Sequence, residues 1–132
     1  MSFERVQRLV DIDENIFAAF VIDTIGNISE LFIAPDSDLD KSKIEKIKSI
    51  LDIKSTLISE REVAENLIGK HKWDVMEFDK LKFIKLYQSG NLEQKMIVVI
   101  AASTKDPGAV VDSVIGYMNE TEEEQPVHNL FD

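Results

Sequence analysis

Two runs of almost uninterrupted apolar residues place the strongest constraint on how this chain can fold. The run at Ile16–Ile22 reads IFAAFVI, and the run at 94–101 reads QKMIVVIA. Apolar residues at successive positions are typical of a strand that is covered on both faces. Both runs are far shorter than the roughly 20 apolar residues of a membrane-spanning helix. They therefore predict two central strands of a sheet that has a layer of structure on each side.

Turn residues and helical periodicity predict the other elements. Gly26 and Asn27 can adopt positive φ and indicate a hairpin after the first apolar run. Ser42-x-x-Glu45 has the form of a capping box, and Asp106-Pro107 is a strong signal for the start of a helix. The elements expected besides the two apolar strands are strands at 28–34, 73–78 and 81–87 and helices at 1–10, 42–68 and from Pro107 onward.

This element order predicts an α+β fold with three layers, α/β/α. Hairpin pairing of neighbouring strands, with the two apolar strands at the centre, gives a five-stranded antiparallel sheet in the order 2-1-5-4-3. The long helix is expected on one face and the two terminal helices on the other, so the strand at 73–78 forms an edge. The composition from Glu120 onward is acidic and interrupted by proline, which indicates a domain over 1–119 and a flexible tail over 120–132.

Composition restricts the classes of partner. Acidic residues outnumber basic ones by 25 to 15 among the 132 residues, for a formal net charge of -10. Such a field repels nucleic acid and anionic membrane surfaces, so we expect neither nucleic-acid binding nor membrane insertion. The absence of cysteine excludes disulfides, thiolate nucleophiles and thiolate metal ligands. With no visible secretory signal, a cytoplasmic protein is expected.

No convergent catalytic or metal-binding site can be recognised. Asp36, Asp38 and Asp40 alternate in a loop, but the glycine and glutamate of a calcium-binding loop do not follow them. His71 and His128 are isolated from other ligand residues. The chain also lacks phosphate-binding glycine loops and the nucleophile elbow. We therefore predict a protein that is not an enzyme and that has no catalytic residues, no metal and no cofactor.

The long helix carries more apolar surface than one sheet can cover. A second stripe of Ile50, Ile53 and Leu57 is rotated by roughly 100° from the stripe that faces the sheet. This stripe contacts either a partner chain or loops of its own protomer. Trp73 is likewise either an interface anchor or a core residue that closes the end of the sheet. The residues predicted to form a dimer or partner interface are Ile50, Ile53, Lys54, Leu57, Trp73, Val75, Met76 and Phe78.

The stretch from Phe17 to Met118 resembles the roadblock/LC7 family, which includes dynein light chains and MglB-type regulators. The resemblance rests on the element order and on the motifs FVIDTIGNISELFIA, IGKHKWDVMEF and MIVVIAASTKDPGAVVDSV. It implies a homodimer in which the second helices pack together and the third strands pair across the two-fold axis. It also implies a role in binding or regulating a small Ras-like GTPase, or in scaffolding a larger complex.

Two other classes of protein share this layered architecture. A PAS-like sensory domain also wraps helices around a five-stranded antiparallel sheet, but it needs a cavity with convergent polar groups. The apolar central strands here favour a filled core instead. A profilin-like or longin-like adaptor has similar layers but fits the lengths of these elements less well.

Overall fold

The computed structural model describes residues 4–23, 25–51, 66–69, 72–87, 96–106 and 108–123. All five predicted strands are present, as are the two terminal helices and the first part of the long helix. The elements are α1 (Glu4–Asp11), β1 (Ile16–Ile22), β2 (Ile28–Ile33), α2 (Lys41–Leu51), β3 (Trp73–Glu77), β4 (Leu81–Tyr87), β5 (Met96–Ala102) and α4 (Ala109–Glu123).

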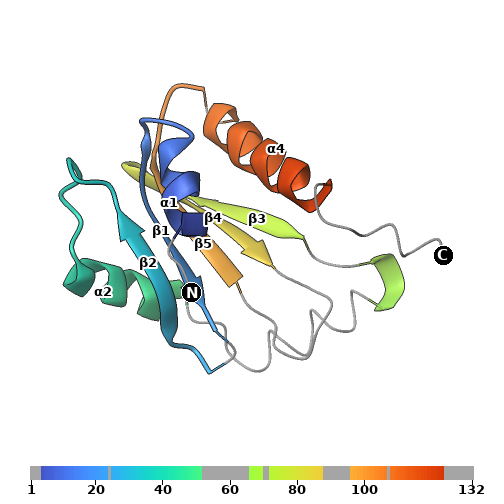
Figure 1. Cartoon of the computed structure of the whole chain (residues 1–132), viewed down its shortest axis with the longest axis horizontal. Coiled ribbons are helices and arrows are strands. Elements are labelled where there is room, and N and C mark those ends of the chain that lie inside the picture. Colours follow the sequence, from blue (N-terminus) through green and yellow to red (C-terminus); the bar gives the residue numbers. More distant parts are fainter. Residues whose placement is uncertain are drawn as a thin grey trace.

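The strands form one antiparallel sheet in the order β2-β1-β5-β4-β3, as predicted. The two apolar strands, β1 and β5, lie next to each other in the middle of this sheet (Figure 1). Phe20 lies opposite Val98, and Ala19 lies opposite Val99. Both strands have a neighbour on each side, which explains why their sequences are apolar throughout. The same order leaves β2 and β3 as the two edges.

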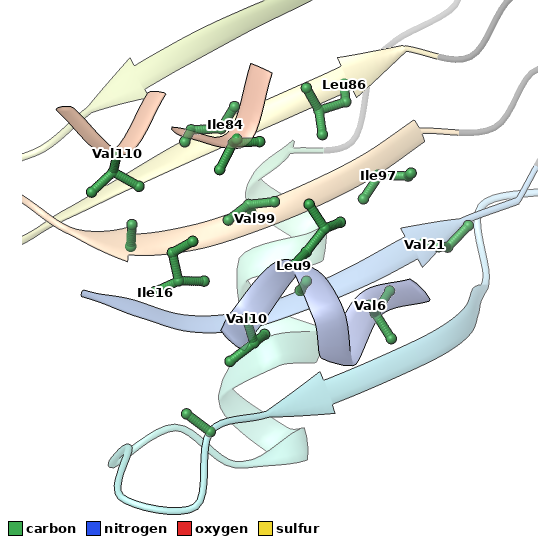
Figure 2. Packing of buried hydrophobic residues seen from close by; sticks show 14 residues of the cluster. Val6, Leu9, Val10, Ile16, Val21, Ile84, Leu86, Ile97, Val99 and Val110 are labelled. Carbon is green, nitrogen blue, oxygen red and sulfur yellow. The ribbon is translucent and has the colours of Figure 1, made fainter. Parts of the chain in front are cut away.

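Helices α1 and α4 cover one face of the sheet (Figure 1). Val6, Leu9 and Val10 of α1 and Val110 and Val114 of α4 are buried in a single cluster (Figure 2). Full burial of each such side chain contributes about 1.5–3 kcal/mol, so this cluster is a main source of stability. The buried side chains of the sheet in this cluster include Ile16, Ala19, Val21, Ile84, Leu86, Ile97, Val99 and Ala101.

Helix α2 covers the opposite face, which confirms the three-layer prediction (Figure 1). Ile44 is completely buried there, and the partly buried Ile47 packs against the same cluster. These two residues belong to the helix stripe that was expected to face the sheet. The buried side chains of the sheet in this cluster are Ala18, Phe20, Phe83, Val98 and Ile100.

The β1–β2 hairpin is closed by one carboxylate. Asp23 Oδ1 accepts hydrogen bonds from the backbone N–H groups of Ile25 (3.0 Å) and Asn27 (2.9 Å). Gly26 adopts a φ of 89°, a region that disfavours residues with a side chain. Lys48 of α2 donates from Nζ to the Gly26 carbonyl oxygen at 2.9 Å. The turn is thus tied to the helix that packs beside it.

Helix α2 begins earlier than the predicted capping box. The carboxylate of Asp40 accepts a hydrogen bond from the N–H of Lys43 (2.8 Å), and its carbonyl oxygen accepts one from the N–H of Ile44 (3.0 Å). Asp40 is therefore the N-cap, and the expectation that the helix opens at Ser42 is wrong. The physical reason is that aspartate caps as well as serine and comes first in the chain.

Helix α4 differs from the prediction at both ends. It begins at Ala109 rather than at position 107, since the N–H of Asp112 donates to the Gly108 carbonyl oxygen (2.8 Å). At its other end the helix continues to Glu123 and so includes Glu120–Glu123, which the composition assigned to the tail. Glutamate is a good helix former, so an acidic segment can prolong a helix that is already packed. Residues 124–132 lie outside the described part of the chain.

Candidate interaction surface

Strand β3 presents an open edge. It pairs with β4 only, and no described strand lies on its other side. At its ends the N–H of Phe78 donates to the Leu81 carbonyl (2.8 Å), and the N–H of Tyr87 donates to the Lys72 carbonyl (2.9 Å). Backbone groups of alternate residues point to the same side of a strand, so the even-numbered residues face β4. The backbone groups that face away from the sheet belong to Trp73, Val75 and Glu77.

The four predicted interface residues of this region divide into two pairs. Val75 packs against the cluster below α1 and α4, and Met76 packs against the cluster below α2, so both anchor the strand. Trp73 and Phe78 are the exposed pair, with 41% and 47% of their surface accessible. The Phe78 ring lies against that of Phe83, with 5.4 Å between centroids and an interplanar angle of 57°. Trp73 and Phe78 therefore offer the apolar surface along the edge.

A buried ion pair fixes one end of β3. The Lys82 side chain is completely buried, and its Nζ lies 3.2 Å from Oε1 of Glu77. The hydroxyl group of Ser103 contacts the other carboxylate oxygen of Glu77 and lies 2.9 Å from the Phe78 carbonyl oxygen. The Glu77 side chain itself is 44% exposed. The charge that neutralises Lys82 thus lies at the open edge.

A second charged group stabilises the other half of the strand. Asp74 lies 3.5 Å from Lys85 Nζ and accepts a hydrogen bond from the Tyr87 hydroxyl group at 2.8 Å. Both partners belong to the neighbouring strand β4. The charges of β3 are therefore compensated inside the protomer, and its outer side is left to backbone groups and to Trp73.

The sequence matches no protein-family model and no curated protein. Its fold does match solved structures. The structure titled MglB with tetrameric arrangement has a TM-score of 0.59 and 14% identity, covering 84% of this chain and 80% of that one. Myxococcus xanthus MglB has a TM-score of 0.56 and 18% identity, covering 88% of this chain and 87% of that one. A Roadblock/LC7 domain from Streptomyces avermitilis has a TM-score of 0.55 and 16% identity, covering 89% and 97%.

The chain has a roadblock/LC7-like fold. This confirms the resemblance seen in the sequence and the predicted strand order. Sequence identities in this range establish the shared fold alone. The function of this roadblock/LC7-like chain therefore has to be argued from its own surface.

The other half of the predicted interface lies outside what the structure describes. Ile53, Lys54 and Leu57 fall between the described ranges, and of Ile50 only the backbone, within α2, is described. The pattern Ser59-x-x-Glu62, a second possible capping box that predicts a kink or restart of the long helix, also lies outside the described residues. Whether the second stripe of the long helix contacts a partner stays a prediction.

Two exposed residues were not among the predicted interface residues. Leu67 and Ile68 are 80% and 84% exposed, just before Gly69, which has a φ of 102° and follows the helical turn. Ile25 at the hairpin tip is the only other large apolar side chain exposed in the described ranges beyond Trp73 and Phe78. Apolar exposure is thus concentrated between residues 67 and 78. The signal in the sequence was an adjacent apolar pair directly before a glycine cap.

The described residues contain no group of three or more histidine, cysteine, aspartate or glutamate side chains placed to hold a metal. Asp40 of the aspartate loop caps α2, and Asp36 and Asp38 are exposed. None of the helices within the described ranges is long and apolar enough to cross a membrane.

Proposed function

We propose that this protein is a non-enzymatic homodimeric interaction module that associates through the edge of β3. The single observation that carries the proposal is an edge strand whose outward backbone groups lie beside an exposed tryptophan. Open edges invite association with other strands, and proteins normally block them with charge, proline or covering structure. The charges of β3 are paired with β4 instead, so a second strand can pair with this edge.

A second copy of the chain fits such an edge. Two-fold dimers use the same patch on both subunits, and one antiparallel strand pair satisfies this requirement. Tryptophan is enriched among the residues that contribute most to binding energy. Leu67 and Ile68, which precede β3 in the chain, are exposed as well. The predicted stripe of Ile50, Ile53 and Leu57 would add to this interface.

We further propose that the dimer binds a small Ras-like GTPase or scaffolds a larger complex in the cytoplasm. The support is the roadblock/LC7-like fold, together with the lack of a nucleotide-binding motif in the chain itself. The arginines of the chain are Arg5, which pairs with Glu30, Arg8 and Arg61, and we nominate none of them as an arginine finger. Any effect on a GTPase would therefore arise from binding and positioning, without a cofactor.

Sedimentation at micromolar concentration tests self-association. The unmodified chain is expected to sediment as a dimer and Trp73→Asp as a folded monomer, because a buried unpaired carboxylate opposes association. Ile25→Asp is the matched control, since Ile25 is also exposed but lies at the hairpin tip. It should remain dimeric. A monomeric unmodified chain would contradict the proposal.

Partner binding is tested separately. The immobilised chain is incubated with extract from the native host, with and without a GTP analogue, and captured proteins are identified by mass spectrometry. A Ras-like GTPase retained by the unmodified chain but lost by Trp73→Asp would indicate that the dimer is the binding form. Recovery of no GTPase in either condition would favour the scaffold role.

A further inference from the structure

We infer that Ser103 is a positioning residue for the edge of the sheet at β3. From the end of β5 it holds the turn that follows β3, on the other side of β4. This role rests on the proposed self-association, because its consequence is that Ser103 keeps β3 ordered for pairing. The supporting observations are the contacts of Ser103 and the burial of Lys82.

Ser103 directly follows β5 but contacts the hairpin formed by β3 and β4. The last residue of β5 is Ala102, and β4 lies between β5 and β3 in the sheet. The Ser103 N–H donates to the Lys80 carbonyl oxygen (3.0 Å), and the Ser103 hydroxyl group donates to the Phe78 carbonyl oxygen (2.9 Å). Phe78 and Lys80 belong to the link between β3 and β4. One residue thus holds two carbonyl groups of this link.

The same hydroxyl group restrains the carboxylate that faces the buried lysine. It contacts one carboxylate oxygen of Glu77, the last residue of β3, and the other oxygen lies 3.2 Å from Lys82 Nζ. The Glu77 side chain is 44% exposed, so water competes for its carboxylate, whereas Lys82 is completely buried. A buried ammonium group is stabilised by acceptors that stay close to it. Ser103 therefore keeps an exposed carboxylate directed toward a buried cation.

Strand β3 needs such support more than the central strands do. It has five residues and pairs with β4 only. A short strand with a neighbour on one side opens more easily than a strand with neighbours on both sides. The cost of ordering a segment reduces the free energy gained when that segment binds. By holding the end of β3, Ser103 lowers this cost, and the residue that leads from β5 toward α4 affects pairing at the opposite edge of β4.

Thr104 provides a matched control. Its hydroxyl group donates to the Asp106 carbonyl oxygen (3.0 Å), so this hydrogen bond stays within the loop before α4. Ser103 and Thr104 are both partly buried. Ser103→Ala and Thr104→Val each remove a hydroxyl group and leave a side chain of similar shape. Only Ser103→Ala removes contacts to the β3–β4 hairpin.

Hydrogen exchange measured by mass spectrometry tests whether Ser103 holds β3, at a concentration at which sedimentation shows monomers. Ser103→Ala is expected to raise the exchange rate of residues 73–81 about 10-fold, the effect of losing one hydrogen bond to a charged group. Residues 16–22 and 96–102 should exchange as in the unmodified chain, and Thr104→Val should change none of these rates. An unchanged rate for residues 73–81, or an equal rise in all three segments, would overturn the inference, because an equal rise reports general stability.

Sedimentation equilibrium tests the consequence for association. Ser103→Ala is expected to raise the dissociation constant of the dimer about 10-fold, and Thr104→Val to leave it within about 2-fold of the unmodified value. An unchanged dissociation constant in Ser103→Ala overturns the inference and leaves the proposed self-association intact. An unmodified chain that stays monomeric contradicts the proposed function itself, and the exchange rates then decide alone whether Ser103 positions β3.

Discussion

The two edge strands of the sheet, β2 and β3, differ in how their charged side chains are paired and in which residues are exposed. At β2, Arg5 of α1 reaches Glu30 with 3.1 Å between Nη2 and Oε2, and every residue of the strand except Ser29 is at least partly buried. At β3 the terminal residues Trp73 and Glu77 are exposed, and the charged side chains pair inward with β4. Helix α1 is linked to the β2 edge by this ion pair, whereas no described helix is linked to β3 by one.

The difference shows how one fold can direct association to one edge. Helix α1 packs on both β1 and β2 and adds a charged pair at the β2 edge, a feature that discourages pairing with another strand. No described helix is tied to β3 by a comparable ion pair. A protein that left both edges open would extend its sheet indefinitely, while a single open edge limits association to a closed pair.

A proline substitution in each edge strand tests whether only β3 takes part in dimer formation. Val75→Pro removes an N–H that faces away from β4, so the protomer keeps its ladder and remains folded. Two such N–H groups meet across the proposed two-fold axis. Their loss is expected to raise the dissociation constant of the dimer about 100-fold, at about 1–1.5 kcal/mol per hydrogen bond. Sedimentation equilibrium measures this constant.

Leu31→Pro is the matched control at the β2 edge. The N–H of Ala34 donates to the Phe17 carbonyl (2.8 Å), so the N–H of Leu31 faces away from β1, as that of Val75 faces away from β4. Both side chains are partly buried. The control variant should keep the dissociation constant of the unmodified chain. Equal weakening by both prolines would mean that the two edges contribute alike, and the comparison would be wrong.

The sequence predicted the sheet better than it predicted which side chains are exposed. The apolar runs at Ile16–Ile22 and Met96–Ala102 determined the strand order, because burial on both faces leaves a pattern that local sequence reveals. The exposure of Leu67 and Ile68 could not be read in the same way, since a helical apolar stripe looks alike whether its partner is a sheet or a second chain. The cap at Asp40 was missed because two competing caps stand close together.

Charge pairing could not be predicted either. Lys82 was not distinguished from other lysines, because its burial depends on the β3–β4 register and on the position of Ser103. The sequence alone did not decide whether Trp73 is an interface anchor or a core residue. A residue at the end of a strand is exposed or buried according to the elements around it, and the local sequence does not place these elements. Its 41% exposure favours the interface interpretation. The burial or exposure of Lys82 and Trp73 thus depends on contacts between segments far apart in the chain, which a local sequence pattern does not reveal.

A second prediction compares the ion pairs of the two edges by their effect on stability. Glu77→Gln removes the charge that neutralises the fully buried Lys82. Leaving a buried charge without its partner costs 3–5 kcal/mol, and the exposure of Glu77 reduces this to about 2 kcal/mol. The expected drop in melting temperature is about 4–8 °C. Thermal unfolding of the Val75→Pro monomer background, with and without Glu77→Gln, separates this effect from dimer dissociation.

The double variant Glu77→Gln/Lys82→Met is its control. Methionine fills a similar volume without a charge, so most of the lost stability should return. If Glu77→Gln alone leaves the melting temperature unchanged, Lys82 must be compensated by other groups, and the ion pair is not what fixes the end of β3.

The smallest effect is expected at the closed edge. Arg5→Gln removes the ion pair with Glu30, but the side chains are 39% and 20% exposed, respectively. Pairs with this degree of solvent contact contribute about 0–1 kcal/mol, so the melting temperature should fall by less than about 3 °C. The variant should also remain dimeric, because Val6, Leu9 and Val10 hold α1 in the core without the arginine. A new, larger assembly in sedimentation would instead show that this ion pair is what keeps β2 closed, and that a single charge separates a protected edge from an open one.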